Sequence, residues 1–152
     1  MKREVRLYLA ADHAGFDMKE KIKRYFDSKK ISYMDLSEKY TKNDDYPDYA
    51  FAIGKRVSKN KNNKGILICG SGSGMSIAAN KVKGIRAVSA YDEYSAKMSR
   101  IDNDTNILGL RGRNFPFSKI KKIVDIWLNT KFSNEERHKR RLRKIERYEN
   151  EN

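Results

Sequence analysis

The fold is decided by residues 65–74, which read GILICGSGSG. The first five residues form the most apolar run in the chain, which predicts a central parallel strand covered on both faces. The alternating glycines and serines predict a loop, and residues 75–81 predict the first turns of a helix. A buried strand that leads through a glycine loop into a helix is typical of an open, doubly wound α/β sheet.

Strand-like and helix-like segments alternate on both sides of this stretch. Short apolar runs predict further strands at residues 5–10, 31–36, 85–90 and 106–110. Apolar residues at helical spacing predict helices at residues 15–29, 48–59, 93–101 and 117–129, and a charged helix at 134–148. The alternation predicts one α/β domain over residues 1–152. Its core would be a three-layer, Rossmann-like sheet of five parallel strands, with residues 133–152 as a charged C-terminal helix.

Chain length and net charge limit the classes of function that the protein could have. A chain of 152 residues fits one compact domain, and 34 Lys and Arg against 20 Asp and Glu leave a formal net charge of +14. The surplus is spread along the chain, which favours phosphorylated small molecules or nucleic acid as partners without choosing between them. A polyanion-binding module therefore stands beside an enzyme as a second hypothesis.

Several classes of protein do not fit the composition. The single cysteine, Cys69, excludes a disulfide framework and a multi-cysteine zinc site, and two histidines are too few for a His/Cys metal cluster. The chain has no run of about 18 apolar residues, so we expect no membrane span. The N-terminus does not read as a secretory signal, so we expect a cytoplasmic protein.

The functional crevice of a doubly wound sheet lies beyond the carboxyl ends of its strands. This places residues 11–15, 69–74, 91–92 and 111–113 at one edge. The glycine loop there could turn its backbone N–H groups toward an anion. It is not the dinucleotide fingerprint, because Met75 replaces the third glycine, and no Gly-Lys-Ser/Thr follows as in a Walker loop. The alternative is a tight turn that needs only a positive φ.

Three side chains at this edge could carry acid–base chemistry. Cys69 ends the buried strand, and a thiol beside a helix N-terminus can act as a base or nucleophile, although free cysteine is just as often a core residue. Asp12 and His13 follow the first strand and offer two hydrogen-bonding tips of different pKa. In the alternative interpretation, Asp12 caps the first helix and His13 is a surface residue.

Two charged groups lie elsewhere. Arg137 and Arg141 are four residues apart on the predicted C-terminal helix, so their guanidinium groups share a face and match a phosphate dianion. A solvated charged helix and an RNA contact are the alternatives. Asp44, Asp45 and Asp48 could bind a hard cation, but we favour a solvated loop and predict no metal site.

Six segments form a specific combination. They are LAADHAGF at 9–16, DYPDYA at 45–50, GILICGSGSGMSIAANKVKGIRA at 65–87, YSAKMSR at 94–100, NDTNIL at 103–108 and RHKRR at 137–141. Together they resemble the ribose-5-phosphate isomerase B family, which is related to the galactose-6-phosphate isomerase subunits. The resemblance covers nearly the whole chain, from about residue 4 to residue 147.

The resemblance implies an enzyme without metal or other cofactor that isomerises D-ribose 5-phosphate to D-ribulose 5-phosphate. In such enzymes the reaction runs through a cis-enediolate, and Cys69 matches the general base. Another branch of the family uses a loop carboxylate where this chain has Met75, so the chain resembles the cysteine branch. Ser71 matches the hydroxyl residue that assists proton transfer at the carbonyl oxygen.

The resemblance also implies a substrate-binding set. The amides of Gly70, Gly72, Ser73 and Gly74 would hold the oxyanion of the enediolate. The side chains of Asp12, His13 and Asn103 would bind the sugar and its far end. The guanidinium groups of Arg137 and Arg141 would clamp the phosphate, with Arg113 as a third positive group.

One position departs from the family's pattern. Several members have a histidine before the Asn-Asp of NDTN, where it is thought to open the furanose ring, and this chain has Asp102. A carboxylate can serve in ring opening, and His13 or His138 are alternatives. The departure leaves open a hexose 6-phosphate, such as allose or galactose 6-phosphate, as the preferred sugar.

The resemblance implies a homodimer, often paired into a homotetramer, with sites between subunits. The charged tail fits this picture, because Leu142 and Ile145 are its only apolar anchors and could hardly hold it on its own chain. The expected partners are a phosphorylated sugar and further copies of the chain, with neither nucleic acid nor membrane.

Overall fold

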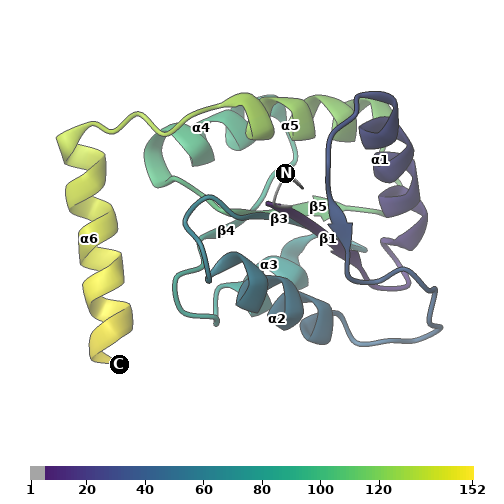
Figure 1. Cartoon of the computed structure of the whole chain (residues 1–152), viewed down its shortest axis with the longest axis horizontal. Helices are drawn as coiled ribbons and strands as arrows, with labels where there is room; N and C mark the ends of the chain where they lie inside the picture. The colour runs from purple at the N-terminus through teal and green to yellow at the C-terminus, as the bar shows by residue number, and fades with distance from the viewer. Residues whose placement is uncertain (1–5) are drawn as a thin grey trace, which may run out of the picture.

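The structure is a computed structural model that describes residues 6–152 (Figure 1). Its parallel strands form one five-stranded sheet in the order β2-β1-β3-β5-β4. The strands are β1 (Leu7–Ala11), β2 (Met34–Asp35), β3 (Lys64–Cys69), β4 (Ala87–Ser89) and β5 (Ile107–Arg111). The strand order reverses between β1 and β3, and ligands of doubly wound sheets bind at such a switch point.

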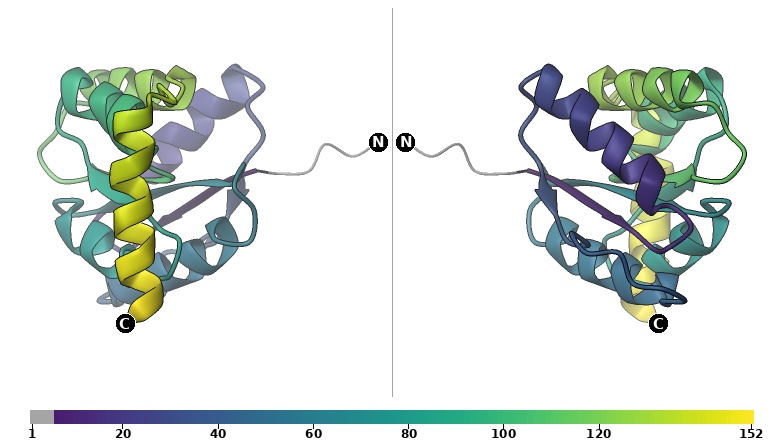
Figure 2. Two further views of the ribbon diagram at one scale, coloured as in Figure 1. Left: turned by 90° about the vertical axis from the view of Figure 1, so that its left-hand side faces the viewer. Right: turned by 90° about the vertical axis from the view of Figure 1, so that its right-hand side faces the viewer.

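Helices cover both faces of the sheet. They are α1 (Phe16–Ser28), α2 (Tyr46–Val57), α3 (Ser73–Ala79), α4 (Glu93–Asn103), α5 (Phe117–Asn129) and α6 (Glu136–Glu151). α1, α4 and α5 lie on one face, and α2 and α3 lie on the other (Figures 1 and 2). The three-layer doubly wound fold predicted from the sequence is confirmed.

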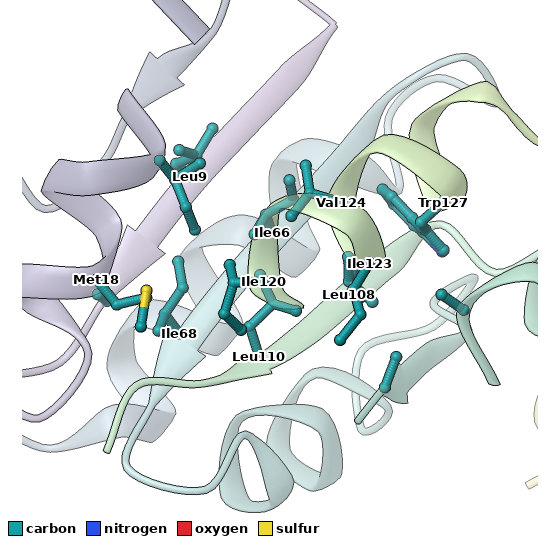
Figure 3. Packing of buried hydrophobic residues seen from close by; sticks show 14 of the residues in the cluster. Leu9, Met18, Ile66, Ile68, Leu108, Leu110, Ile120, Ile123, Val124 and Trp127 are labelled. Atoms are coloured by element: carbon teal, nitrogen blue, oxygen red, sulfur yellow. The ribbon is translucent and has the colours of Figure 1, made fainter. Parts of the chain in front are cut away.

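Side chains of the central strands alternate between two apolar layers. Leu9, Ile66 and Leu108 belong to the layer under α1 and α5, which Figure 3 shows together with Trp127. Leu67 and its neighbours on the opposite face belong to the layer under α2 and α3. β3 is buried on both faces over residues 65–69, which explains why this segment is continuously apolar.

Both edge strands are shorter than the sequence predicts. The predicted strand at 31–36 shrinks to β2, which pairs with β1 only at two positions, and Ile31 and Tyr33 pack against the apolar layer instead. The predicted strand at 85–90 shrinks to β4. An edge strand has a single neighbour, so its length depends on tertiary pairing rather than on its own pattern. Val5, in the predicted first strand, lies outside the described residues.

Several helix ends also differ from the predictions. α2 begins at Tyr46, two residues early, with Pro47 in its first turn. α3 begins at Ser73, so the last two residues of the predicted loop are helical. α4 extends to Asn103, two residues further than predicted, and Asp104 caps its C-terminus with a left-handed φ of 45°. Asp102 and Asn103 therefore lie in the last turn of a helix.

The charged C-terminal helix, α6, lies beyond the β4 edge of the sheet and crosses from the α4 side to the α3 side (Figures 1 and 2). His138 is its only buried residue among those described. Glu149, near the far end, accepts a hydrogen bond from the Gly84 N–H at 3.0 Å. Within the described part of the chain, no helix combines the length and the apolar character needed to cross a membrane.

Candidate active site

A cleft of about 560 Å³ lies at the carboxyl edge of the sheet, where the sequence places the crevice. Segments that follow four strands line it: residues 12–14 after β1, residues 69–71 at the end of β3, Tyr91 after β4, and Arg111 and Arg113 at β5. Gly74 and Tyr46 complete the lining. The cleft therefore gathers side chains that are far apart in the sequence.

The glycine loop has a position where only glycine fits, and it also offers backbone N–H groups to an anion. Gly72 has a φ of 85°, and a Cβ there would lie 2.9 Å from the carbonyl carbon of Leu110, so only glycine fits. The tight-turn interpretation thus holds for Gly72. α3 is only seven residues long, so the loop's own N–H groups, rather than the dipole of a long helix, are what it offers to an anion.

Cys69 is both a core residue and a residue of the cleft wall, the two possibilities that its sequence position left open. Its side chain packs with the apolar layer under α2 and α3 and is only 4% exposed, yet it lines the cleft. The Gly72 N–H donates to the Cys69 Sγ at 3.1 Å. This hydrogen bond ties the sulfur to the glycine loop at the wall of the cleft.

Asp12 anchors the turn that leads from β1 to α1. Its Oδ1 accepts hydrogen bonds from the Ala14 and Gly15 N–H groups, each at 3.0 Å. Burial raises the pKa of Asp12 above its ordinary range, although these hydrogen bonds act in the opposite direction. The helix itself begins after Gly15 without a side-chain cap, so the alternative interpretation, in which Asp12 caps α1, does not hold.

His13 is held by an acidic residue 31 positions away. Asp44 Oδ1 accepts the His13 backbone N–H and lies 2.8 Å from its ring Nδ1, and Tyr49 donates its hydroxyl to Asp44 Oδ2 at 2.7 Å. Although burial raises it, the hydrogen bonds from Tyr49 and His13 hold the pKa of Asp44 below its usual range. From the sequence, Asp44 was either a possible cation ligand or, as we favoured, a residue of a solvated loop, because nothing local points from it to His13.

Three of the described residues could offer ligand atoms to a metal. Asp12, His13 and Asp44 place one such atom each within 4.8 Å of one another. The His13 Nδ1 and Asp44 Oδ1 already satisfy each other by a direct contact of 2.8 Å. These atoms are therefore accounted for by hydrogen bonding.

Two guanidinium groups lie beside the glycine loop. Arg113 packs so closely on Gly70 that a Cβ there would lie 3.1 Å from its Nη1. Arg111 donates from Nε to the Arg113 carbonyl at 2.7 Å and lies over the Phe115 ring, 5.5 Å from its centroid. Arg113 was predicted as a substrate contact, whereas Arg111 was only placed at the correct edge.

Tyr46 is a lining residue that the sequence analysis missed. It opens α2, and its ring lies against Gly74, where a Cβ would come within 2.8 Å of the ring. The DYPDYA segment contains Tyr46, but the helix predicted from periodicity begins only at residue 48 and does not include it. Its place in the cleft depends on how α2 packs on α3.

Six predicted site residues are not among those that line this cleft: Gly72 and Ser73 belong to its glycine loop, and the other four lie elsewhere. Asp102, Asn103, Arg137 and Arg141 lie instead where the end of α4 meets the start of α6. The Asp102 Oδ1 is 3.4 Å from His138 Nε2. Within one chain these four residues are separated from the cleft, because α6 lies beyond the β4 edge of the sheet (Figure 1).

We call these four residues the tail cluster. Glu135 accepts a hydrogen bond from Arg137 Nε at 2.7 Å and, together with the charge of Asp102, raises the pKa of Arg137. Arg137 and Arg141 are both exposed and follow each other by one helical turn. The tail cluster thus offers cations and carboxylates to a neighbouring surface.

The chain is similar to known proteins over nearly all of its length. A family model described as Ribose/Galactose Isomerase matches residues 7–145. Ribose-5-phosphate isomerase B of Escherichia coli (strain K12) is 38% identical over 140 residues, which is 92% of this chain and 93% of that protein.

Comparison with solved structures gives the same family of relatives. The crystal structure of ribose-5-phosphate isomerase B from Mycoplasma genitalium with bound ribulose-5-phosphate matches with a TM-score of 0.91 and 40% identity, covering 96% of this chain and 97% of that one. A ribose 5-phosphate isomerase from Thermotoga maritima matches with a TM-score of 0.89 and 41% identity, covering 95% and 99% of the two chains.

The fold and its cleft define a doubly wound α/β protein that receives a small molecule at the carboxyl edge of its sheet. Sequence and structure comparisons extend over the same residues. The chain belongs to the Ribose/Galactose Isomerase family. The resemblance inferred from the motifs is confirmed, and the names of the relatives agree with the predicted class of enzyme, an aldose–ketose isomerase.

Proposed function

We propose that the chain interconverts D-ribose 5-phosphate and D-ribulose 5-phosphate, with Cys69 as the general base. The observation that carries this proposal is the position of the Cys69 sulfur. It lines the cleft, accepts an N–H from Gly72 and lies in the same cleft as Arg111 and Arg113. The names of the relatives supply the sugar.

The chemistry is a proton shift between adjacent carbons. The thiolate of Cys69 removes the proton from C2 of the open aldose, and the C1 carbonyl oxygen becomes the oxyanion of a cis-enediolate. Amide N–H groups of the loop, over Gly70, Gly72, Ser73 and Gly74, stabilise this oxyanion, and Ser71 relays a proton at the same oxygen. A proton also moves from the C2 hydroxyl to this C1 oxygen, and return of the first proton from Cys69 to C1 yields the ketose, so no oxidant or reductant is needed.

Substrate binding uses both ends of the cleft. Asp12 and His13 would bind hydroxyl groups or the far end of the sugar, because their side chains flank the loop. Arg113 supplies a guanidinium for the phosphate beside Gly70. The tail-cluster residues Arg137 and Arg141 would complete the phosphate clamp.

We propose that a second copy of the chain brings its tail cluster to this cleft in a homodimer. Two observations support this arrangement: the cleft of one chain has none of the four tail-cluster residues, and α6 buries only His138 against its own chain. A partner would then supply Asn103 and the two arginines, and Asp102 would act in ring opening. Pairs of dimers would form a homotetramer in the same way.

The central test is the Cys69→Ala variant. Turnover of ribose 5-phosphate, followed with EDTA present, should fall by a factor of about 10² to 10⁴ if the thiol is a general base. Binding should survive, which the rise in melting temperature on adding ribose 5-phosphate would measure. Full activity in Cys69→Ala would end the proposal.

The identity of the sugar needs its own comparison. We expect the highest kcat/KM for ribose 5-phosphate among a panel that includes allose 6-phosphate and galactose 6-phosphate. A hexose 6-phosphate with the higher value would reassign the substrate while leaving the proton shift unchanged.

A further inference from the structure

The carbonyl groups of residues 69–72 each accept a hydrogen bond from a residue outside this stretch. On the β5 side, the Cys69 carbonyl accepts the Gly112 N–H at 2.8 Å, and the Gly70 carbonyl accepts the Arg113 N–H at 3.2 Å. Backbone donors therefore hold the first half of the loop. Substitution of side chains does not remove these bonds.

Side-chain hydroxyls hold the second half. The Gly72 carbonyl accepts from Ser76 Oγ and from Ser89 Oγ, each at 2.9 Å. The Ser71 carbonyl accepts from the hydroxyl of Tyr91 at 2.6 Å. The Gly72 carbonyl also accepts the Ser76 backbone N–H at 3.3 Å, whereas the hydrogen bond to the Ser71 carbonyl comes from one hydroxyl.

The Tyr91 hydrogen bond determines where an N–H points. A peptide unit is planar and trans, so its C=O and the N–H that follows point in opposite directions. With the Ser71 C=O directed at Tyr91, the Gly72 N–H faces the other way and donates to Cys69 Sγ at 3.1 Å. Tyr91 and the sulfur lie on opposite sides of one peptide unit.

The ring of Tyr91 is itself supported. It packs edge-on against Phe115, with ring centroids 6.4 Å apart and an interplanar angle of 85°. Its hydroxyl also lies 3.5 Å from Ser73 Oγ. The ring can therefore keep its place when only the hydroxyl is removed.

We propose that Tyr91 is a positioning residue for Cys69, because its hydroxyl holds the 71–72 peptide unit so that the Gly72 N–H stabilises the thiolate. The inference rests on the proposed role of Cys69 as the base. It adds a residue outside the loop, on the segment after β4, to the set that controls the reacting sulfur.

The test uses the fact that Cys69 is the only cysteine in the chain. Alkylation by iodoacetamide, measured without substrate across a pH series, then reports this one thiol. In Tyr91→Phe the pH of half-maximal alkylation rate should rise by about half a unit, which is about a threefold change in the ionisation equilibrium. The midpoint is the readout because a more basic thiolate is also more nucleophilic, which masks part of the change in rate at one pH.

A matched variant and steady-state kinetics complete the test. Tyr94→Phe removes a hydroxyl from a side chain that is 74% exposed, and its midpoint should equal that of the wild type. Tyr91→Phe should lower kcat several-fold while KM stays within about twofold, because a hydrogen bond to the loop rather than to the sugar is lost.

Each outcome decides something. A wild-type midpoint in Tyr91→Phe overturns the inference, and so does a loss of kcat/KM with no change in midpoint, since Tyr91 would then act by touching the substrate. A shifted midpoint together with full turnover in Cys69→Ala keeps the positioning role and removes the proposed function. Equal melting temperatures of the two Phe variants would show that the fold is intact.

Discussion

At the scale of single residues, hydrogen bonds that cross long stretches of sequence prepare the cleft. Asp44 accepts from both the backbone and the ring of His13, and Tyr49 completes its coordination. With Nδ1 on Asp44, the remaining ring nitrogen, Nε2, is the one that His13 can offer to a substrate. In the proposed function, Asp44 would therefore act on the substrate through His13.

The Asp44→Asn variant tests this arrangement. The amide keeps the size of the side chain but removes the charge, so kcat/KM should fall about tenfold, as expected for losing a hydrogen bond to a charged group. Asp48→Asn, an exposed change in the same segment, is the matched control and should stay near wild type. Unchanged kcat/KM in Asp44→Asn would contradict the role given to Asp44.

The same carboxyl should make stability depend on acid. The pKa of Asp44 is below its usual range in the folded state, because hydrogen bonds from Tyr49 and His13 outweigh the raising effect of burial. The carboxylate therefore stabilises the fold above its unfolded pKa of about 3.9, and this contribution is lost as pH falls through the folded pKa. Urea unfolding should show a gap between wild type and Asp44→Asn that is constant at pH 5–7 and shrinks below pH 4. A gap that widened in acid would reverse the sign.

At the scale of elements, β3 carries a reactive side chain at each end. Cys69 closes the strand at the cleft, and Lys64 opens it at the opposite edge of the sheet. The Lys64 Nζ lies 5.4 Å from the centroid of the Trp127 ring. Burial, with a smaller contribution from the nearby charge of Arg100, lowers the pKa of Lys64 to about 8.

Lys64→Met should stabilise the chain at neutral pH. In the wild type the folded state resists protonating Lys64, so stability rises with pH from about 8 to the unfolded pKa of about 10.4. Methionine keeps the apolar stem without the charge, and we expect a gain of about 1 kcal/mol at pH 7, after allowance for the partly exposed amine. Chemical denaturation at pH 7 and pH 10 would measure it, with Lys61→Met as the exposed control. A gain as large at pH 10 as at pH 7 would refute the explanation.

For some elements, the periodicity of apolar residues is enough to predict where the element begins and ends. α5 begins and ends at the predicted residues, 117 and 129, because Ile120, Ile123, Val124 and Trp127 mark one buried face. β2 and β4 were predicted too long, because edge strands pair with one neighbour only. The centres of elements follow local pattern, whereas their ends follow contacts.

At the scale of the whole molecule, the cleft and the tail cluster are two parts of the proposed site on different sides of one chain. A homodimer would join the tail cluster of each copy to the cleft of the other. Such a symmetric pair has two equal sites, and each contains residues from both copies. Part of the net charge of +14 would then serve substrate binding, since arginines of the cleft and of the tail cluster would face one phosphate.

Complementation between two inactive variants would test this joint site. Cys69→Ala and the double variant Arg137→Ala/Arg141→Ala should each be nearly inactive alone. After mixing and subunit exchange, half of the dimers are mixed and each has one intact site, so activity should recover to about a quarter of wild type. If each cleft used its own tail, no mixed dimer would hold an intact site, and activity would not return.

Local chemistry in the chain was enough to predict the class of fold and the edge of the sheet that holds the cleft, whereas the roles expected of Cys69, Asp12 and His13 come from the family resemblance and stay predictions. Apolar runs, helical spacing and glycine conformation act over a few residues, so they can be read along the chain. The hydrogen bonds from His13 to Asp44 and from Tyr91 to Ser71, and the separation of Arg137 from the cleft, emerged only in three dimensions. They depend on which distant segments the packed layers bring together, and no short-range pattern encodes that.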